Sequence, residues 1–449
     1  MTPSPRERRQ DAPGDILPAE REARPSAGVS VPGALILAAL LGLALGETAW
    51  AADPAAAEKP DTCVACHQAV GGSMAKPLED RKADVHAAKG ISCAACHGGD
   101  PGRMDMDSMA KAKGFVGRPD RRDVPRLCAR CHSDGAFMRR FNPALRTDQL
   151  AQYQTSIHGK RLAGGDIKVA VCTDCHGVHS ILPANQVQSR VHPVRVAETC
   201  GRCHGDAEYM KGYKIPTDQL ALYRESIHGE LLLKRQDLAA PTCNKCHGNH
   251  GAFPPEVTSI AGICGQCHVI NKDLFLQSKH HAAFDRMKLP ECVTCHSNHG
   301  IKRASDEMVG VGEKGLCKNC HAPGTRGYQA AEQMGKMIAD LGGAVRRGET
   351  KLAEAERAGM EVSDAKYEFQ NARTALIKAR NEVHIFDPDR LNKVTGPGIE
   401  LADKGYQAGQ AALDELGYRK RWSLIPLAAI VAVAVGLVFQ IRRLEGGNG

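Results

Sequence analysis

The residues from Cys172 to His179, Cys-Thr-Asp-Cys-His-Gly-Val-His, hold two cysteines three positions apart, a histidine directly after the second, and another histidine three positions later. All 18 cysteines of the 449-residue chain lie in such C-x-x-C-H pentapeptides. The nine copies are Cys63/Cys66/His67, Cys93/Cys96/His97, Cys128/Cys131/His132, Cys172/Cys175/His176, Cys200/Cys203/His204, Cys243/Cys246/His247, Cys264/Cys267/His268, Cys292/Cys295/His296 and Cys317/Cys320/His321. Two thiols at this spacing can reach both vinyl groups of one porphyrin while the adjacent imidazole lies under the iron. The pattern predicts nine covalent c-type haems.

Three other uses of paired cysteines fit the pattern less well. A structural zinc site of the four-cysteine type needs two C-x-x-C pairs, so nine pairs would leave one over. Zinc also gives no reason for a histidine after every second cysteine. Redox dithiols occur once or twice in a domain, and a disulfide framework would not repeat one pentapeptide.

Composition agrees with an interior filled by a cofactor. Aromatic residues make up only 4% of the chain, and the haem rings would supply the missing planar apolar area. The formal net charge is +8, but each haem adds two propionates, so a nucleic-acid partner has no support. We expect a mainly α-helical fold with few strands, comprising a haem-packed body, a long C-terminal helical arm and one C-terminal transmembrane helix.

An internal repeat organises the cysteine-rich part. The segment 147–159, Thr-Asp-Gln-Leu-Ala-x-Tyr-x-x-Ser-Ile-His-Gly, recurs at 217–229, and a weaker copy lies at 278–280. Each copy precedes a C-x-x-C-H with a further histidine, and a second C-x-x-C-H closes the unit. We expect a three-haem unit over residues 52–146, two-haem units over 147–216, 217–273 and 274–321, and the helical arm over 322–421.

Histidines outside the pentapeptides are candidates for the second axial ligand of each iron. A histidine three positions after the proximal one lies on the same side of a helical turn, so it should ligate a neighbouring haem. The histidine of each Ser-x-His lead-in recurs at a fixed position before a motif and is a second kind of candidate. Six distal candidates lie in the repeats, and His86 and His384 lie outside them. The full set is His86, His158, His179, His228, His250, His280, His299 and His384.

The N-terminal unit has fewer candidates than haems. It holds His86 alone, and Asp100 stands three residues after His97. Two of the three histidines outside the repeats, His192, His281 and His384, would complete nine bis-histidine pairs. We favour His384, because its neighbours are apolar, although a hydrogen-bonded core histidine is the alternative. A methionine ligand would compete and would raise the potential of its haem. The candidates are Met104, Met106 and Met109.

Two apolar stretches define the expected topology. Residues 31–45 and the small-x-small sequence Ala49-Trp50-Ala51 predict a signal peptide over residues 1–51. Residues 422–441 carry no charge and would form about 30 Å of helix, enough to span a bilayer. Because thioether attachment takes place outside the cytoplasm, residues 52–421 would be periplasmic and 442–449 cytoplasmic. The alternative for 422–441 is a buried core helix.

The cysteine-free stretch 330–417 has helical periodicity, with Met334, Ile338 and Leu341 on one face. We expect two or three long helices folding back over the haem body. Glycine and proline predict weak points or breaks at Gly342-Gly343, Gly359, Asp387-Pro388 and Gly396-Pro397-Gly398.

The nine motifs, the C-x-x-C-H-x-x-H form and the Ser-Ile-His-Gly lead-in resemble those of periplasmic multihaem c-type cytochromes of anaerobic respiratory bacteria. The resemblance covers about residues 60–321. It implies low-potential, mostly bis-histidine haems that pass electrons between an inner-membrane quinol-oxidising complex or b-type cytochrome and periplasmic or outer-membrane cytochromes, with the lipid bilayer as anchor.

A second resemblance leaves another function open. The C-terminal helices with an embedded histidine are similar to the multihaem nitrite and hydroxylamine oxidoreductase group, whose active haem has an open distal face. Its reductase branch often uses C-x-x-C-K, which this chain lacks. The alternative is therefore a reductase of a small nitrogen or sulfur oxyanion. The histidine count favours the electron carrier, with no catalytic residue, because ten non-motif histidines suffice for nine irons.

Overall fold

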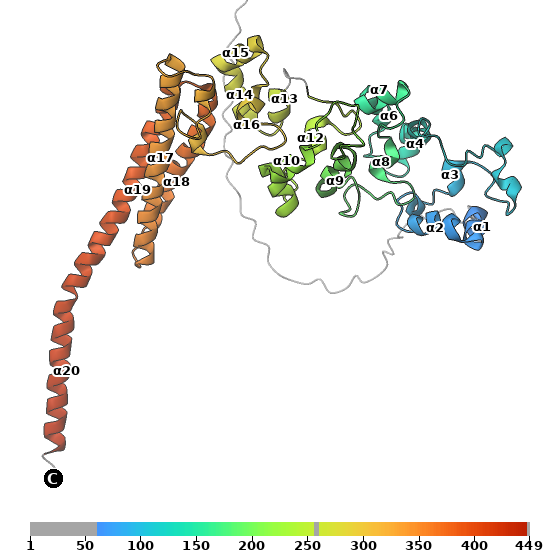
Figure 1. The fold of residues 1–449 in the computed structure, drawn as a ribbon. Helices are drawn as coiled ribbons and strands as arrows, with labels where there is room; N and C mark the ends of the chain where they lie inside the picture. Colours follow the sequence, from blue (N-terminus) through green and yellow to red (C-terminus); the bar gives the residue numbers. More distant parts are fainter. Residues whose placement is uncertain (1–60, 256–259, 447–449) are drawn as a thin grey trace, which may run out of the picture. The chain divides into compact units, whose positions relative to one another are not determined.

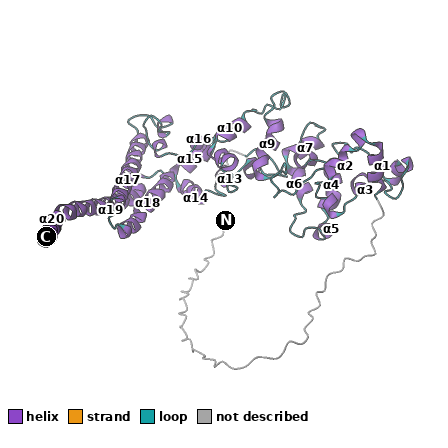
Figure 2. Cartoon of the chain, turned by 90° about the horizontal axis from the view of Figure 1, so that it is seen from below, coloured by secondary structure: helices purple, strands orange, loops and turns teal. Residues whose placement is uncertain are grey.

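The computed structural model describes residues 61–255 and 260–446, and these fold into helices and loops with no strand (Figures 1 and 2). The mainly α-helical fold is confirmed. The predicted signal peptide lies outside the described residues. The α-helices of the cysteine-rich part are α1 Thr62–Val70, α2 Lys76–Arg81, α3 Cys93–His97, α4 Val124–His132, α5 Gly135–Arg139, α6 Gln149–Thr155, α7 Ile157–Ala163, α8 Cys172–His176, α9 Pro193–His204, α10 Gln219–Glu225, α11 Ile227–Gly229, α12 Cys243–His247, α13 Ile260–Cys264, α14 Val269–Gln277, α15 Lys279–Met287 and α16 Glu291–His296.

Shorter helical turns join these elements. The 3-10 turns are η1 Gly72–Met74, η2 Ala87–Lys89, η3 Met106–Met109, η4 Lys111–Lys113, η7 Asp306–Met308, η8 Cys317–Asn319 and η9 Val383–Ile385, and η5 Glu230–Lys234 is a π-helical turn. Most pentapeptides form one helical turn, either alone, as in α3, α8 and α12, or at the end of a longer helix, as in α4 and α9. One turn places both thiols of a pentapeptide on the same face, because residues three apart are neighbours on a helix.

Two pentapeptides depart from this helical turn. α13 ends at Cys264, so Cys267 lies beyond the helix, and a Cβ on the intervening Gly265 would come 2.6 Å from the Ala261 carbonyl oxygen. In the last pentapeptide η8 ends at Asn319, so Cys320 likewise follows the regular turn. Both of these cysteines are exposed, whereas Cys131 lies inside α4 and is half-buried. The nine pentapeptides therefore share a sequence pattern but not one backbone conformation.

Side-chain cores are small in the cysteine-rich part. Buried apolar residues form separate clusters of three or four, such as the one built from Val124, Leu162, Val169 and Val171. The arm, by contrast, holds one cluster of fourteen buried residues. The protein side chains of the cysteine-rich part therefore bury little apolar surface of their own.

The Ser-Ile-His-Gly lead-in is a helix start with a fixed geometry. The Ser156 hydroxyl accepts a hydrogen bond from the Gly159 amide at 2.9 Å and donates one to the Tyr153 carbonyl at 2.6 Å. A Cβ on Gly159 would lie 1.9 Å from that carbonyl oxygen, so only glycine fits. Ser226 and Gly229 repeat the arrangement, with an amide bond of 3.0 Å. The motif thus fixes the backbone on both sides of its histidine.

The arm consists of three long helices, α17 Arg326–Arg357, α18 Ser363–Glu382 and α19 Pro388–Trp422 (Figure 1). The sequence predicted two or three long helices, and the structure has three. Phe369 of α18 is 2% exposed and lies between Gly348 and Gly405, where a Cβ would come within 2.4 and 2.2 Å of its ring. The glycines allow the helix backbones to approach closely around this ring.

The break predicted at Gly396-Pro397-Gly398 is wrong, and the weak point predicted at Gly342-Gly343 does not interrupt its helix. α17 continues through Gly342-Gly343, and α19 continues through Gly396-Pro397-Gly398. A Cβ on Gly398 would lie 2.8 Å from the Ala375 Cβ, so this glycine is a packing position. The buried three-helix cluster offsets the hydrogen bond that Pro397 cannot donate. The breaks at Gly359, with φ +83°, and at Asp387, whose carboxylate caps α19, are confirmed.

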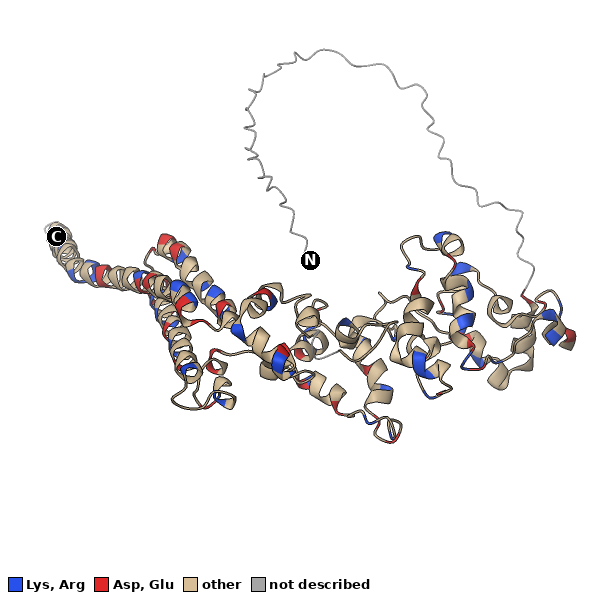
Figure 3. Cartoon of the chain, turned by 90° about the horizontal axis from the view of Figure 1, so that it is seen from above, with Lys and Arg blue, Asp and Glu red and all other residues tan. Residues whose placement is uncertain are grey.

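The arm contacts the last cysteine-rich unit through polar and close backbone contacts. Arg380 of α18 binds both carboxylate oxygens of Asp306, at 2.8 and 2.9 Å. Gly327 of α17 lies against the ring of His321, where a Cβ would come 2.1 Å from Nδ1. Basic and acidic residues are interspersed over the described helices, with no long run of one sign (Figure 3).

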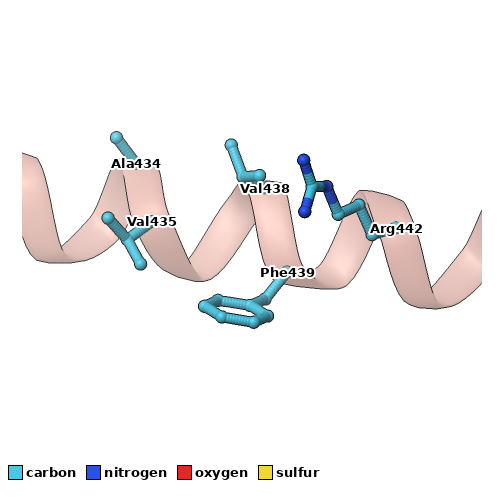
Figure 4. A pocket seen from close by; sticks show the side chains of 5 residues that line it. All are labelled: Ala434, Val435, Val438, Phe439 and Arg442. Carbon is cyan, nitrogen blue, oxygen red and sulfur yellow. The ribbon is translucent and has the colours of Figure 1, made fainter.

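The C-terminal helix α20, Leu424–Glu445, is apolar and exposed along its length. With α19 it includes a stretch whose mean hydropathy is 2.6 and of which 0% is buried, long enough to cross a membrane. The exposed side chains argue against the alternative of a buried core helix. Ala434, Val438 and Arg442 follow one another along one side, so the apolar surface ends at an arginine (Figure 4).

We predict that Phe369→Ala lowers the free energy of local unfolding of the arm by about 3–5 kcal/mol, because it removes a buried ring between close-packed helices. Hydrogen exchange of α18 in the haem-loaded protein measures this change. Tyr367→Ala, at a position that is 76% exposed on the same helix, is the control and should leave exchange unchanged. Equal protection in both variants would contradict the packing.

Candidate functional site: facing histidines

Eight histidine pairs face each other across a common distance, and each pair joins one pentapeptide histidine to one of the predicted distal candidates. The ring centroids lie 5.9 Å apart for His86–His132, 6.0 Å for His97–His179, 6.1 Å for His158–His204, 6.2 Å for His176–His250, 6.4 Å for His228–His268, 5.9 Å for His247–His299, 5.9 Å for His280–His321 and 6.2 Å for His296–His384. The structure therefore brings every predicted distal histidine to a different pentapeptide.

This common distance suits a metal ion between the two rings of each pair. Two imidazole nitrogens, each about 2 Å from one metal and on opposite sides of it, place the ring centres about 6 Å apart. No cluster of three His, Cys, Asp or Glu side chains that could hold a metal occurs among residues 61–255 and 260–446. A metal in these gaps needs its other ligands from a non-protein group, and a porphyrin supplies four in one plane. The residues fit haem iron.

Hydrogen bonds orient several of the rings. Nδ1 of His97 lies 2.8 Å from the Gly117 carbonyl oxygen, and Nδ1 of His384 lies 2.9 Å from that of Asn381. The corresponding distance from His247 to Phe253 is 3.2 Å. An Nδ1–H group that donates to a carbonyl leaves the Nε2 lone pair free for a metal.

Burial favours the neutral form of eleven of the paired imidazoles. Desolvation is the largest cause of a lowered pKa at His132, His158, His176, His179, His204, His228, His250, His280, His296, His299 and His384. Only the neutral ring can ligate, so a lowered pKa favours metal binding at neutral pH.

One distal histidine has a buried carboxylate beside it. Asp84 is 4% exposed, and its Oδ1 lies 3.2 Å from Nδ1 of His86. The same carboxylate accepts hydrogen bonds from the backbone amides of His86 at 2.8 Å and Ile181 at 2.7 Å. A carboxylate that accepts the Nδ1 proton makes the imidazole a stronger donor to its metal. The sequence analysis missed Asp84, because its partner Ile181 is distant in sequence.

The pairs follow a simple rule when the pentapeptides are numbered in chain order as sites 1 to 9. Sites 2, 4 and 6 face the histidine that follows the pentapeptide of the next even site, His179, His250 and His299. Sites 3, 5, 7 and 9 face the lead-in histidine of their own unit, respectively His86, His158, His228 and His280. Site 8 faces His384 of the arm. By this rule His86 and sites 2 and 3 form a unit like the later ones, and site 1 stands alone.

Site 1 differs from the others. Among the described residues, which include every histidine of the chain, no imidazole faces His67 at the distance of the eight pairs. His192 is 6% exposed, and its Nδ1 accepts the Val194 amide at 3.4 Å as a helix cap. The ring of His281 lies edge-on to Phe275 at 5.8 Å. Of the three histidines outside the repeats, the structure brings only His384 to a pentapeptide.

The sites adjoin one another in chain order. At every junction between adjoining sites, the negative charge of one cysteine raises the pKa of a cysteine in the neighbouring site. The pairs are Cys63 with Cys93, Cys96 with Cys128, Cys128 with Cys172, Cys175 with Cys203, Cys200 with Cys243, Cys246 with Cys264, Cys264 with Cys292 and Cys295 with Cys317. All 18 cysteines, which lie in the described residues, are free of disulfides. Attachment points of successive cofactors are therefore neighbours from site 1 to site 9.

The second cysteines of sites 3, 7 and 9 also lie at junctions. Each of them raises the pKa of the second cysteine of the preceding site through charge repulsion between thiolates. The pairs are Cys131 with Cys96, Cys267 with Cys246 and Cys320 with Cys295. At sites 7 and 9 this second cysteine follows the end of the helical turn. It therefore does not share one helical face with the first cysteine of its own pentapeptide, as the two cysteines of most other sites do. Haem attachment at these three thiols, as at the other fifteen, stays a prediction.

Polar side chains fix some of these junctions. The Asp61 carboxylate accepts hydrogen bonds from the amides of both Cys63 and Cys93, each at 3.2 Å, and so ties site 1 to site 2. Arg130 of site 3 donates to the carbonyl of Cys96 at 2.9 Å, and Arg202 of site 5 donates to that of Asp174 at 2.7 Å. Both arginines directly precede the second cysteine of their pentapeptide. This shared position is the sequence feature that could have identified them as links between sites, but it was not used.

Two family models match parts of the chain. The model described as cytochrome c3 matches residues 85–205, and that described as cytochrome c554 and c-prime matches residues 46–98. The first spans His86 to site 5, which is two complete ligand units, and the second includes sites 1 and 2. No curated protein and no solved structure matches. The matches and the paired histidines support a multihaem c-type cytochrome.

We predict that His384→Ala leaves the number of covalent haems unchanged and converts the haem of site 8 to high spin, because this site loses its second imidazole. Electronic absorption and electron paramagnetic resonance of the oxidised protein measure this change. His281→Ala is the matched control, since its ring faces no pentapeptide. An unchanged spectrum in His384→Ala would remove this residue from the ligands.

We predict that Asp84→Asn raises the midpoint potential of one haem, because a neutral partner weakens donation from His86 to ferric iron more than to ferrous iron. A tenfold fall in the ratio of ferric to ferrous binding strength corresponds to a rise of about 59 mV in a one-electron midpoint potential. A spectroscopic redox titration measures it. Glu79→Gln, an exposed carboxylate of the same segment that pairs with Lys82, is the control. Unchanged potentials would show that Asp84 only positions the backbone.

Proposed function

We propose that the protein is a membrane-anchored nonahaem c-type cytochrome. It carries electrons between a quinol-linked inner-membrane partner, such as a quinol-oxidising complex or b-type cytochrome, and periplasmic or outer-membrane cytochromes. Each haem, when bound, supplies an iron that alternates between the ferrous and ferric states. The residues of the chain attach the haems, order them and hold them near the membrane.

The observation that carries the proposal is the continuous series of neighbouring cysteines. At each of the eight junctions a thiol of one site interacts with a thiol of the next. Because a thioether fixes one edge of each porphyrin, neighbouring thiols bring neighbouring ring edges together. A series without a gap suits transfer by successive short steps along the chain.

The facing imidazoles suit a carrier. The two facing imidazoles of a site would hold the iron through nitrogen in either oxidation state, so little would have to move when an electron arrives. Their neutral form, favoured by burial, adds no charge to the site. Sites 2 to 9, with paired imidazoles, therefore have the ligands of outer-sphere electron carriers.

The C-terminal helix supports attachment to a membrane. α20 is exposed and apolar, and Arg442 and Arg443 follow the apolar stretch. Tyr418 and Trp422 lie together just before it, with ring centroids 6.0 Å apart, where aromatic side chains often mark a membrane surface. We place the haem sites in the periplasm, because c-type haems are attached outside the cytoplasm. The signal peptide over residues 1–51 belongs to this proposal.

One observation favours the alternative function, a multihaem oxidoreductase for a nitrogen or sulfur oxyanion with one open haem. At site 1, His67 has no facing imidazole. The other eight sites each have two. Electron transfer remains the proposed role of the series, and any reaction with a small molecule is restricted to its first site.

Quinol-dependent reduction tests the proposed function. Inner membranes containing the full-length cytochrome are compared with the same membranes mixed with a variant that ends at Arg421 and lacks α20. We expect quinol to reduce the haems of the anchored protein at least tenfold faster than those of the truncated protein. Dithionite is the control and should reduce both completely. Equal rates, or haems that stay oxidised with quinol, would contradict the proposal.

A further inference from the structure

The ligand rule explains why site 1 has no facing histidine. Every other odd-numbered site takes the lead-in histidine that precedes the even site of its unit, as site 3 takes His86. Site 1 has no even site before it, and residues 1–60 contain no histidine. Site 1 therefore has no source for this ligand.

The remaining histidines are committed elsewhere. Of the 19 in the chain, nine belong to pentapeptides and eight face them. His192 is buried and caps the start of α9, and His281 packs against Phe275. These two positions leave no histidine for the distal side of site 1.

The segment that follows His67 is exposed and packs against no neighbour in the described part of the chain. α1, which carries site 1, ends at Val70, whose side chain is 67% exposed. Gly71 and Gly72 follow with φ of +70° and +57°, and a Cβ on either would meet nothing within 4 Å. Hydrogen bonds from Thr62 to the carbonyls of Pro101 and Arg103 bring the segment before Met104 beside α1. Met104 itself is 60% exposed, so its side chain is directed largely to solvent.

Site 1 also lies at a particular place in the series. Site 1 is joined to site 2 by Asp61, whose carboxylate accepts the amides of both Cys63 and Cys93, and site 2 is joined to site 3 by Arg130, while the arm contacts the last sites, through His384 at site 8 and Gly327 at site 9. The arm leads to the membrane helix. Site 1 is thus the terminus of the series opposite the membrane end.

We infer that the haem on Cys63 and Cys66 binds an exogenous small molecule as its sixth ligand, and that this site ends the electron series. The ligand class comprises small donors to haem iron, such as carbon monoxide and cyanide. Binding forms one bond to iron and breaks none in the chain. The inference rests on the proposed function, because it requires that haem is attached at site 1.

Carbon monoxide titration tests the inference. The full-length holoprotein is reduced with dithionite and titrated, and bound carbon monoxide is counted per protein from the absorption change. We expect one molecule per nine haems, and one high-spin haem in the oxidised protein that converts to low spin with cyanide. The haem count by mass tests attachment separately, so a failure of the proposed function is distinguishable from a filled sixth position.

Variants identify the site. Cys63→Ala/Cys66→Ala should lose one haem and all carbon monoxide binding while eight low-spin haems remain. His384→Ala is the positive control, because it opens site 8 and should raise the count to two. His192→Ala and His281→Ala are matched controls and should leave the count at one. Carbon monoxide binding that survives the double cysteine variant would overturn the inference.

Two further results would also overturn it. The first is a protein that is entirely low spin and binds no carbon monoxide. The second is a low-spin site 1 that becomes high spin only when Met74, Met104, Met106 and Met109 are replaced together by leucine, since this would show a methionine ligand. If His192→Ala or His281→Ala creates a new high-spin haem, the assignment of that histidine away from the haems is wrong.

Discussion

The structure of the cysteine-rich part depends on pairs of imidazoles that face one another about 6 Å apart, the distance set by a metal between them. Most pairs join segments that are far apart in sequence, as His97 with His179 and His296 with His384 do. The buried apolar clusters between them contain only three or four residues. In the proposed cytochrome, links through the metal and the apolar surface of the porphyrins would supply the cohesion that side chains supply in the arm. Such a chain is expected to fold only as the cofactors are attached.

The same pairs give the series an order. Because an even site takes its second imidazole from the next unit, each unit is tied to the one before it. The odd sites take theirs from within the unit, so each unit also holds its own two haems together. After site 9 no further unit follows, and the arm supplies His384 to site 8 instead. The next two residues anchor this segment of the arm: Ile385 is buried, and the ring of Phe386 lies 4.0 Å from that of His280. At the beginning of the series no unit precedes, and the ligand is missing. Both ends follow from one rule.

Much of the site could be predicted from the sequence. The pentapeptides predict the attachment residues. Because positions i and i+3 share one side of a helix, His179, His250 and His299 were assigned to neighbouring sites, and the structure places each of them opposite another pentapeptide. The apolar neighbours of His384 pointed to it among the three remaining histidines. The pentapeptide histidine that each distal histidine faces could not be predicted from the sequence, because it depends on how the repeated units pack against one another.

Other features escaped the sequence because they depend on contacts between segments. Asp84 and Asp61 were missed for this reason. The uniform pentapeptide pattern also gave no sign that Cys267 and Cys320 follow the end of a helical turn, whereas Cys131 lies inside one. In the arm, local glycine and proline preferences wrongly predicted a break at Gly396-Pro397-Gly398, where packing against α17 and α18 dominates.

The central claim is that every thiol pair in this chain is bonded to an iron porphyrin. The intact mass of the exported, purified protein under denaturing conditions tests it most directly, because thioether bonds survive unfolding and axial ligands do not. The account predicts the mass of the processed polypeptide plus nine haems. A mass equal to that of the bare polypeptide, or zinc released in place of haem, would contradict it.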